Sequence, residues 1–149
     1  VYLGYKSLGN LFDTPGIEIQ NLKKKLFIVV KKYLKFYQDS NEIFIKNFPK
    51  KKIIKSWYIR IKKGGGIDYH IHNSWLSAVM YTQLPTKIEG GKLNLSIINW
   101  GFKKEKKFIR TVNPTLGKLV IFPSSLPHKV SKFNHNKYRI SIAFDIIPG

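Results

Sequence analysis

The first regular pattern along the chain is helical and covers residues 17–37. Apolar side chains recur there at intervals of three and four residues, and lysines occupy the opposite face. Thr14 and Pro15, just before this segment, are typical of an N-cap and a first helical position. We expect one amphipathic helix of about twenty residues that packs its apolar stripe on a sheet, the less common alternative being a helix on a membrane surface.

From Lys55 onward the pattern changes to short runs that are typical of β-strands. Residues 55–62 alternate and are rich in β-branched and aromatic side chains, and similar runs follow at 75–84, 92–100, 106–112, 117–123 and 138–147. Three glycines at 64–66 are expected to end the first run. This spacing after a leading helix predicts a mostly-β fold, an antiparallel sandwich or barrel, with residues 1–54 as N-terminal helical cover.

The length and composition predict a single domain over residues 1–149, without an internal repeat or a linker. Cysteine is absent, so a bound metal would have histidine, carboxylate or other oxygen ligands. There is no apolar run of about twenty residues and no signal pattern, so we expect a cytoplasmic protein without a membrane partner. Because the chain begins with Val1 rather than methionine, we also expect it to be a piece of a longer one.

The formal net charge of +19 is of the kind that nucleic-acid-binding proteins carry. However, 24 of the 27 cationic residues are lysines, and they are spread from Lys6 to Lys137. Arginine rather than lysine supplies the planar fork that binds phosphates and bases in two-point contacts. The pattern therefore indicates a lysine-rich solvated surface, which binds polyanions non-specifically at low salt and has no specific nucleic-acid partner.

Three of the four histidines occupy positions that favour a metal site. His70 and His72 are two residues apart, so in a strand their side chains point to the same face, with Cα atoms about 6.6 Å apart. His128 follows another apolar run and a tight turn, and is the natural third ligand. The spacing alone also fits a half-exposed strand pair and an unrelated loop histidine. His135, in the segment FNHNK, is expected to be a solvated turn residue.

The last predicted strand carries an unusual polar face. Arg139 and Ser141 alternate with apolar residues, and Arg139 is one of only three arginines in the chain. A guanidinium fork with a neighbouring hydroxyl is a good receptor for a carboxylate. Beside a metal ion, this receptor favours an anionic cosubstrate that chelates the metal at its other end.

These residues together resemble the non-haem Fe(II), 2-oxoglutarate-dependent oxygenases. More narrowly, the segments DYHIHNSWLSAVMY, GGKLNLS, GKLVIFPSSLPHKV and YRISIAFDIIP resemble a small bacterial group of 2-oxoglutarate-Fe(II) oxygenases with the motifs H-x-H-P, G-W-L-S, Y-Y, F-P-S and R-x-S-x-A-F-D. Asn73 stands where that group usually has proline. The resemblance covers residues 55–149 and implies a double-stranded β-helix, the cupin-like jelly-roll, as the core.

The resemblance also implies a ligand set. Fe(II) would be held by His70, His72 and His128, and Arg139 with Ser141 would bind the far carboxylate of 2-oxoglutarate, with O2 as the second cosubstrate.

His72 is the departure from the usual pattern, because most of the superfamily has a carboxylate ligand at this position. Two alternatives stay open. Iron could have only two histidine ligands, as in the related aspartyl/asparaginyl β-hydroxylases, with either His70 or His72 as the proximal one. Asp68, on the same face as these two, could instead be the carboxylate ligand.

The function implied is hydroxylation of a small-molecule or peptidyl substrate with release of succinate and CO2. A cupin-like metal or ligand binding module without oxygenase turnover is the first alternative, and a nucleic-acid-directed protein is the second. The loops expected to select the substrate lie at 86–92 and 102–108, where the sequence carries no chemical signature.

Overall fold

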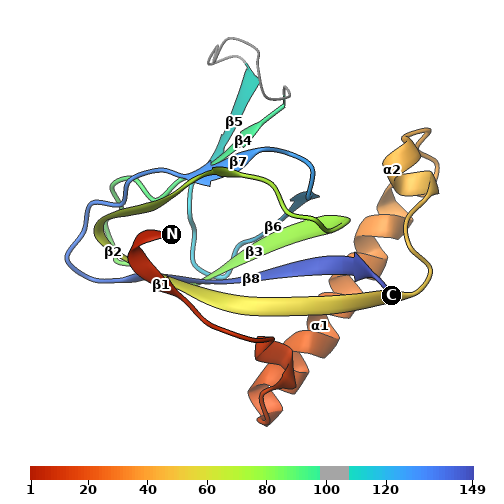
Figure 1. Cartoon of the computed structure of the whole chain (residues 1–149), viewed down its shortest axis with the longest axis horizontal. Coiled ribbons are helices and arrows are strands. Elements are labelled where there is room, and N and C mark those ends of the chain that lie inside the picture. The colour runs from red at the N-terminus through yellow and green to blue at the C-terminus, as the bar shows by residue number, and fades with distance from the viewer. Residues whose placement is uncertain (98–107) are drawn as a thin grey trace.

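The protein is described by a computed structural model that covers residues 1–97 and 108–149. Within these residues a curled antiparallel sheet is the main element, and the helices precede its second strand (Figure 1). The mostly-β fold with N-terminal helical cover is confirmed. In chain order the elements are β1 (Tyr2–Lys6), the 3-10 helix η1 (Leu11–Asp13), α1 (Ile17–Phe36), α2 (Ile43–Lys46), β2 (Lys52–His70), β3 (Leu76–Gln83), β4 (Leu93–Ser96), β5 (Ile109–Val112), β6 (Leu119–Pro123), β7 (His128–Val130) and β8 (Arg139–Pro148).

The glycines at 64–66 do not end a strand, and this prediction is wrong. β2 runs through them: its first part pairs with β8 and its last part pairs with β7. β2 thus runs beside β8, curls at the left of Figure 1 and returns beside β7. Glycine is required there because β1 crosses closely: a Cβ on Gly65 would lie 2.5 Å from the carbonyl oxygen of Leu3.

The N-terminal cover is also not purely helical, which corrects the prediction for residues 1–54. β1 pairs antiparallel with β2, from Tyr2 opposite Gly66 to Lys6 opposite Ile59. The long helix begins at Ile17 rather than beside Thr14, because the Thr14 N–H donates to the carbonyl of Leu11 and closes the preceding 3-10 turn.

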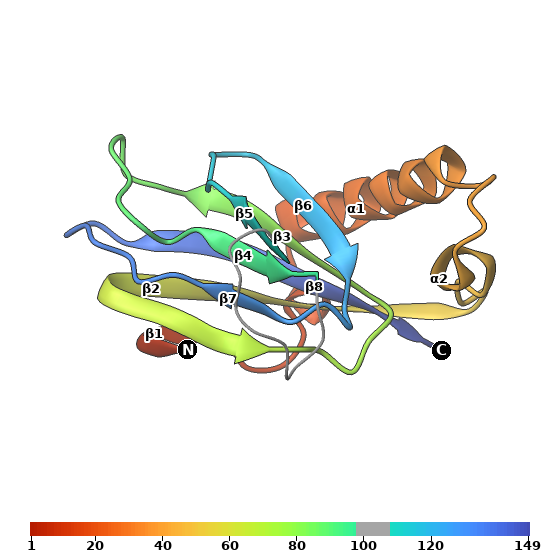
Figure 2. The same cartoon turned by 90° about the horizontal axis from the view of Figure 1, so that it is seen from above.

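Helix α1 packs on the sheet, as its apolar stripe predicted. Leu26 and Val30 are its buried residues, and they join a cluster with residues of β2, β3 and β8 (Figures 1 and 2). The sheet residues in this cluster are Ile54, Leu76, Ala78, Phe144 and Ile146. In β8 these apolar positions alternate with Ala143 and Asp145, so the opposite face of the same strand is left for the interior of the jelly-roll.

That interior face combines apolar walls with a few polar side chains. One apolar cluster contains Trp57, Ile59, Ile61, Val130, Phe133 and Ala143, and a second contains Leu93, Leu95 and Phe122. Between them, the register places Ser77 of β3 opposite Asp145 of β8, and Tyr81 opposite Ser141. Because these pairs alternate with the residues under α1, the fold gathers polar groups inside the jelly-roll.

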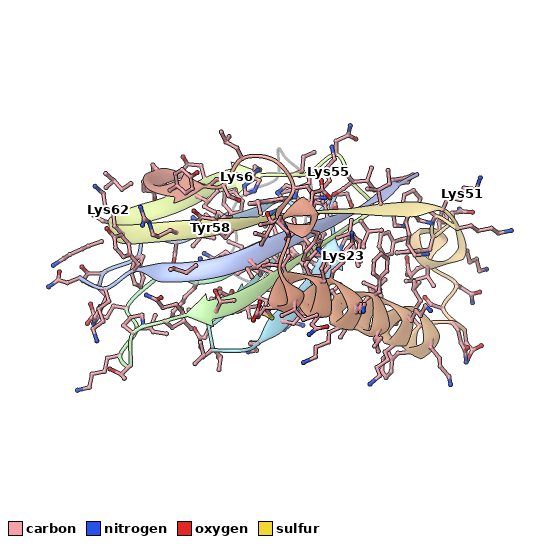
Figure 3. The ribbon with its side chains drawn as sticks, turned by 90° about the horizontal axis from the view of Figure 1, so that it is seen from below. Lys6, Lys23, Lys51, Lys55, Tyr58 and Lys62 are labelled. Carbon is pink, nitrogen blue, oxygen red and sulfur yellow. The ribbon has the colours of Figure 1, made fainter. Side chains whose placement is uncertain are left out.

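The lysines are spread over several elements rather than gathered on one. Figure 3 shows Lys23 on α1, Lys6 on β1 and Lys55 and Lys62 on β2, with Lys51 at the end where β2 begins. No helix in the described ranges is long and apolar enough to cross a membrane.

Three sequence predictions extend beyond the described residues. Positions 98–107 include the end of the predicted strand 92–100, the start of 106–112 and most of the expected loop 102–108. The described parts of the two runs form β4 and β5, which pair antiparallel.

Candidate metal centre and active site

Three histidines meet at one end of the jelly-roll interior. His70 is the last residue of β2, and it lies directly opposite His128, the first residue of β7. His72 follows two residues after the strand, where its backbone N–H donates to the carbonyl of Ser124 at 3.2 Å. One ligand nitrogen from each ring lies within 4.8 Å of the other two. The spacing and the tertiary fold therefore bring together the three histidines predicted as ligands.

In His70 and His128 the Nδ1 atom is hydrogen-bonded, so Nε2 is the nitrogen that is available to a metal ion. The Nδ1 of His70 lies 2.8 Å from the carbonyl oxygen of Asp68, and that of His128 lies 2.9 Å from the carbonyl oxygen of Leu126. A carbonyl only accepts, so in both rings Nδ1 carries the proton and Nε2 has a free lone pair. This tautomer leaves Nε2 available to bind a metal ion.

His72 has a different partner. Its Nδ1 lies 2.9 Å from both carboxylate oxygens of Asp145 on β8. The Ser77 hydroxyl donates to the same carboxylate at 2.7 Å, and it is 2.8 Å from the Ser124 hydroxyl. Asp145 was assigned no role from the sequence, although it continues the alternation of Arg139 and Ser141.

The electrostatics of the site favour neutral imidazoles at His70 and His128. Burial lowers the pKa of His128 to about 4, and it lowers the pKa of His70 as well. The hydrogen bonds to backbone carbonyls oppose this effect in both rings without outweighing it. A neutral imidazole is the form that binds a metal ion, so little proton displacement would accompany binding at neutral pH.

A cavity of about 480 Å³ connects the histidines to the predicted carboxylate receptor. Arg139 lines it and is only 1% exposed, with Nε donating to the Gly91 carbonyl at 3.2 Å and Nη1 donating to the Ser141 hydroxyl at 3.1 Å. Within the described ranges no carboxylate lies within 4.0 Å of this guanidinium. A buried cation without a counter-charge is costly, so the cavity is suited to an anion.

Tyr81 is a neighbour of Arg139 that the sequence did not identify as part of the receptor. It is fully buried on β3, and its ring lies 5.0 Å from the Cζ atom of Arg139. The hydroxyl interacts electrostatically with the guanidinium but makes no hydrogen bond of good geometry among the described residues. The hydroxyl proton therefore has no acceptor among the described residues, and it lies beside a buried guanidinium, although Tyr81 does not itself line the cavity.

Other residues near the histidines have different roles. Asp68 lines the same cavity but is exposed, and its carboxylate is not among the converging ligand atoms. Trp57 lines the cavity, whereas the indole N–H of Trp75 donates to the carbonyl of Phe44 on α2. His135 accepts a hydrogen bond from its own turn at Lys137 and does not line the cavity.

A jelly-roll with three converging imidazoles and a buried guanidinium in one cavity defines a candidate site for a metal ion and an anion together. A family model described as "Putative 2OG-Fe(II) oxygenase" matches residues 55–145. The match covers more than half of the chain, so the chain belongs to this 2-oxoglutarate-Fe(II) oxygenase family. A search of curated proteins found no match.

Solved structures show the same fold at low sequence identity. The chain superimposes on a prolyl hydroxylase from Trichoplax adhaerens, solved with a hypoxia-inducible-factor peptide fragment, with a TM-score of 0.63 and 18% identity over 97% of this chain and 63% of that one. An oxidoreductase of the 2OG-Fe(II) oxygenase family from Burkholderia pseudomallei gives a TM-score of 0.56 and 16% identity, over 78% of this chain and 50% of that one. A Pseudomonas putida prolyl-4-hydroxylase gives 0.50 and 22%, over 64% and 52%. The chain thus spans between half and two thirds of the length of these proteins.

Proposed function

We propose that the chain is an Fe(II)- and 2-oxoglutarate-dependent oxygenase that hydroxylates a small-molecule or peptidyl substrate. The observation that carries this proposal is the buried Arg139, which has no carboxylate partner among the described residues and lines the same cavity as the three histidines. Family membership supports the reaction class. A peptidyl substrate is supported by the likeness to the Trichoplax enzyme, whose structure contains a peptide fragment.

The residues present fit Fe(II). His70 and His128 offer a free Nε2 lone pair toward a common point, and His72 offers the third nitrogen. Imidazole nitrogen is a suitable ligand for Fe(II), and no thiolate is available in this chain. When bound, the metal supplies reductive activation of O2 coupled to decarboxylation of 2-oxoglutarate to succinate and CO2, with the second oxygen atom inserted into a substrate C–H bond.

The protein's own contribution at the other end of the cavity is to bind and orient the cosubstrate. The Arg139 guanidinium and the Tyr81 hydroxyl present donors to the far carboxylate of 2-oxoglutarate, and Ser141 holds Arg139 in place through Nη1. Binding here neutralises a buried cation, so the carboxylate interaction is made at low local dielectric.

The walls of the cavity restrict what enters and exclude water. Between the histidines and Arg139 they are mainly apolar and include Trp57, Ile59, Val79, Leu93 and Phe122. Exclusion of water protects the reactive step from side reactions.

The test is an anaerobic Fe(II) titration with and without 2-oxoglutarate, read by the visible metal-to-ligand charge-transfer band. The band should develop in the wild-type chain only when both are present. R139A should still bind metal but lose at least tenfold in 2-oxoglutarate affinity, since removing one partner of a buried charge contact typically costs about 2–5 kcal/mol. R60A is the control, because Arg60 lies over the Tyr138 ring and does not line the cavity. Iron binding without the band would favour a metal-binding module without turnover.

A further inference from the structure

The Nδ1 partners of the three histidines differ in kind. For His70 and His128 the partner is the backbone carbonyl two residues earlier in the chain, which any residue at that position supplies. For His72 the nearest partner is the side chain of Asp145 on β8, and the Ser77 hydroxyl lies at 3.2 Å from the same nitrogen. Only His72 therefore has a partner that depends on a particular side chain.

Asp145 is buried and held by a network of serine hydroxyls. The residue is 8% exposed, and Ser77, which donates to it, is 1% exposed. The Ser77 hydroxyl in turn contacts Ser124, which accepts a hydrogen bond from the Ser74 hydroxyl at 2.7 Å. These contacts fix the carboxylate against Nδ1 of His72, whereas a surface carboxylate would be free to rotate.

The Asp145 carboxylate also brings negative charge close to the proposed metal site. Three imidazoles bring no negative charge to a divalent cation, whereas the common facial triad brings one through its carboxylate. Asp145 is the one carboxylate in ion-pair distance of a histidine in the part of the chain that the structure describes. A carboxylate that accepts the Nδ1 proton of a ligating histidine raises the basicity of that ring at Nε2.

We propose that Asp145 is a positioning residue for the metal centre: it orients His72, keeps the proton of that ring on Nδ1, and supplies from outside the ligand set the negative charge that a direct carboxylate ligand would bring. This inference rests on the proposed metal site, and it makes His72 a ligand rather than a neighbour of a two-histidine iron.

The substitution D145N discriminates this role from simple packing. Asparagine has nearly the same shape, but it lacks the charge and presents an amide N–H in place of one oxygen. Both carboxylate oxygens lie 2.9 Å from Nδ1 of His72, and Ser77 donates to Oδ1, so asparagine keeps its oxygen at the position of Oδ1 and places an N–H against Nδ1 at the position of Oδ2. An N–H facing Nδ1 drives the ring proton to Nε2, the nitrogen needed for the metal, as happens when a triad aspartate is replaced by asparagine.

Two readouts test the proposal on the whole chain. The tautomer of His72 is read by side-chain ¹H–¹⁵N correlation spectra of the metal-free protein, assigned with H72Q. The affinity for Co(II), an oxygen-stable probe of the site, is read by absorbance titration. D145N should show the Nε2–H tautomer and a loss of about 10–100-fold in Co(II) affinity, the usual effect of removing such a partner. S77A, which retains the carboxylate, should keep the Nδ1–H tautomer and lose less affinity. D39N, in the exposed turn after α1, should change neither readout.

The outcomes distinguish failure of the metal site from failure of the role of Asp145. A wild-type chain that binds no Co(II) overturns the metal site itself, and the role of Asp145 with it. Wild-type binding with unchanged affinity in a D145N protein of normal urea stability overturns the role of Asp145 alone. If D145N does not fold, the wild-type spectrum still decides, because an Nε2–H tautomer of His72 in the native protein contradicts the proposal.

Discussion

His70 and His128 face each other directly in the antiparallel ladder between β2 and β7, and their ring centroids are 4.2 Å apart. Neither ring is positioned by a long loop, since each sits at the end of a strand that is hydrogen-bonded to the other. The ladder therefore holds two candidate ligands at contact distance before any metal arrives, which reduces the entropy lost on binding.

Loss of either of these rings should abolish tight metal binding. H70A and H128A each remove a candidate ligand, and we expect Fe(II) or Co(II) affinity to fall by more than about 100-fold, which exceeds the loss expected when only a hydrogen-bond partner of a ligand is removed. Calorimetric titration under anaerobic conditions measures the effect. H135A is the matched control, because His135 bonds within its own turn. Near wild-type binding by both site variants would argue against these residues as ligands.

Substitution of Tyr81 should affect stability and cosubstrate binding in opposite directions. Y81F removes a buried hydroxyl that has no hydrogen-bond partner among the described residues, so the free energy of unfolding should stay unchanged or rise by about 1 kcal/mol. Affinity for 2-oxoglutarate should fall about tenfold, because a hydrogen bond to a charged group contributes roughly 1.5–3 kcal/mol. Urea denaturation and the charge-transfer titration measure the two effects, with the exposed Tyr5→Phe as control. A Y81F chain with full 2-oxoglutarate affinity would remove Tyr81 from the receptor.

Gly91 should be required for two reasons: its backbone has a positive φ, and a side chain there would displace Arg139. Its φ is +62°, and a Cβ there would lie 3.0 Å from Cδ of Arg139 and 3.1 Å from the ring of Phe133. Gly9 has a similar φ of +70° with nothing within 4 Å of the added Cβ. Both G91A and G9A should lose about 1–2 kcal/mol of stability from the left-handed backbone. Only G91A should also weaken 2-oxoglutarate binding, and equal binding by the two variants would contradict this role.

The metal-free protein should lose stability on mild acidification. Because the folded-state pKa of His128 is about 4, against its ordinary value of 6.5, the unfolded chain takes up a proton between these values that the folded chain does not. The free energy of unfolding should therefore fall as the pH drops from about 6.5 to about 4, by at most about 3 kcal/mol from this residue, and not further below. Urea denaturation in the presence of a chelator measures it. H128N should show a shallower pH dependence; an identical slope in both chains would contradict the assignment.

The sequence was a good guide to the elements and a poorer one to their limits. The period of the apolar residues in α1 and the alternation in β3 and β8 follow from local geometry, so they could be read in advance. The path of β2 through its glycines could not, because the reason is the close approach of β1, a segment more than fifty residues earlier.

The candidate site shows the same division. The site residues carry chemistry that is rare enough in this lysine-rich chain to be recognised: His70, His72, His128, Arg139 and Ser141. The prediction that His70 and His72 share one strand face is wrong, because β2 ends at His70 and the tertiary fold, not the strand pleat, places the His72 ring. The partners of these residues were not recognisable: Asp145 looked like the end of an apolar strand, and Ser77 and Tyr81 like ordinary strand residues.

By itself the sequence determined the chemical types available at the site and the local periodicity that divides each strand into two faces. The tertiary structure decided which of those faces meet: that His70 lies opposite His128, that Asp145 reaches His72, and that Arg139 is enclosed without a carboxylate partner among the described residues. The physical reason is that strand periodicity is a property of neighbouring residues, whereas pairing register and burial depend on contacts between segments far apart in the chain.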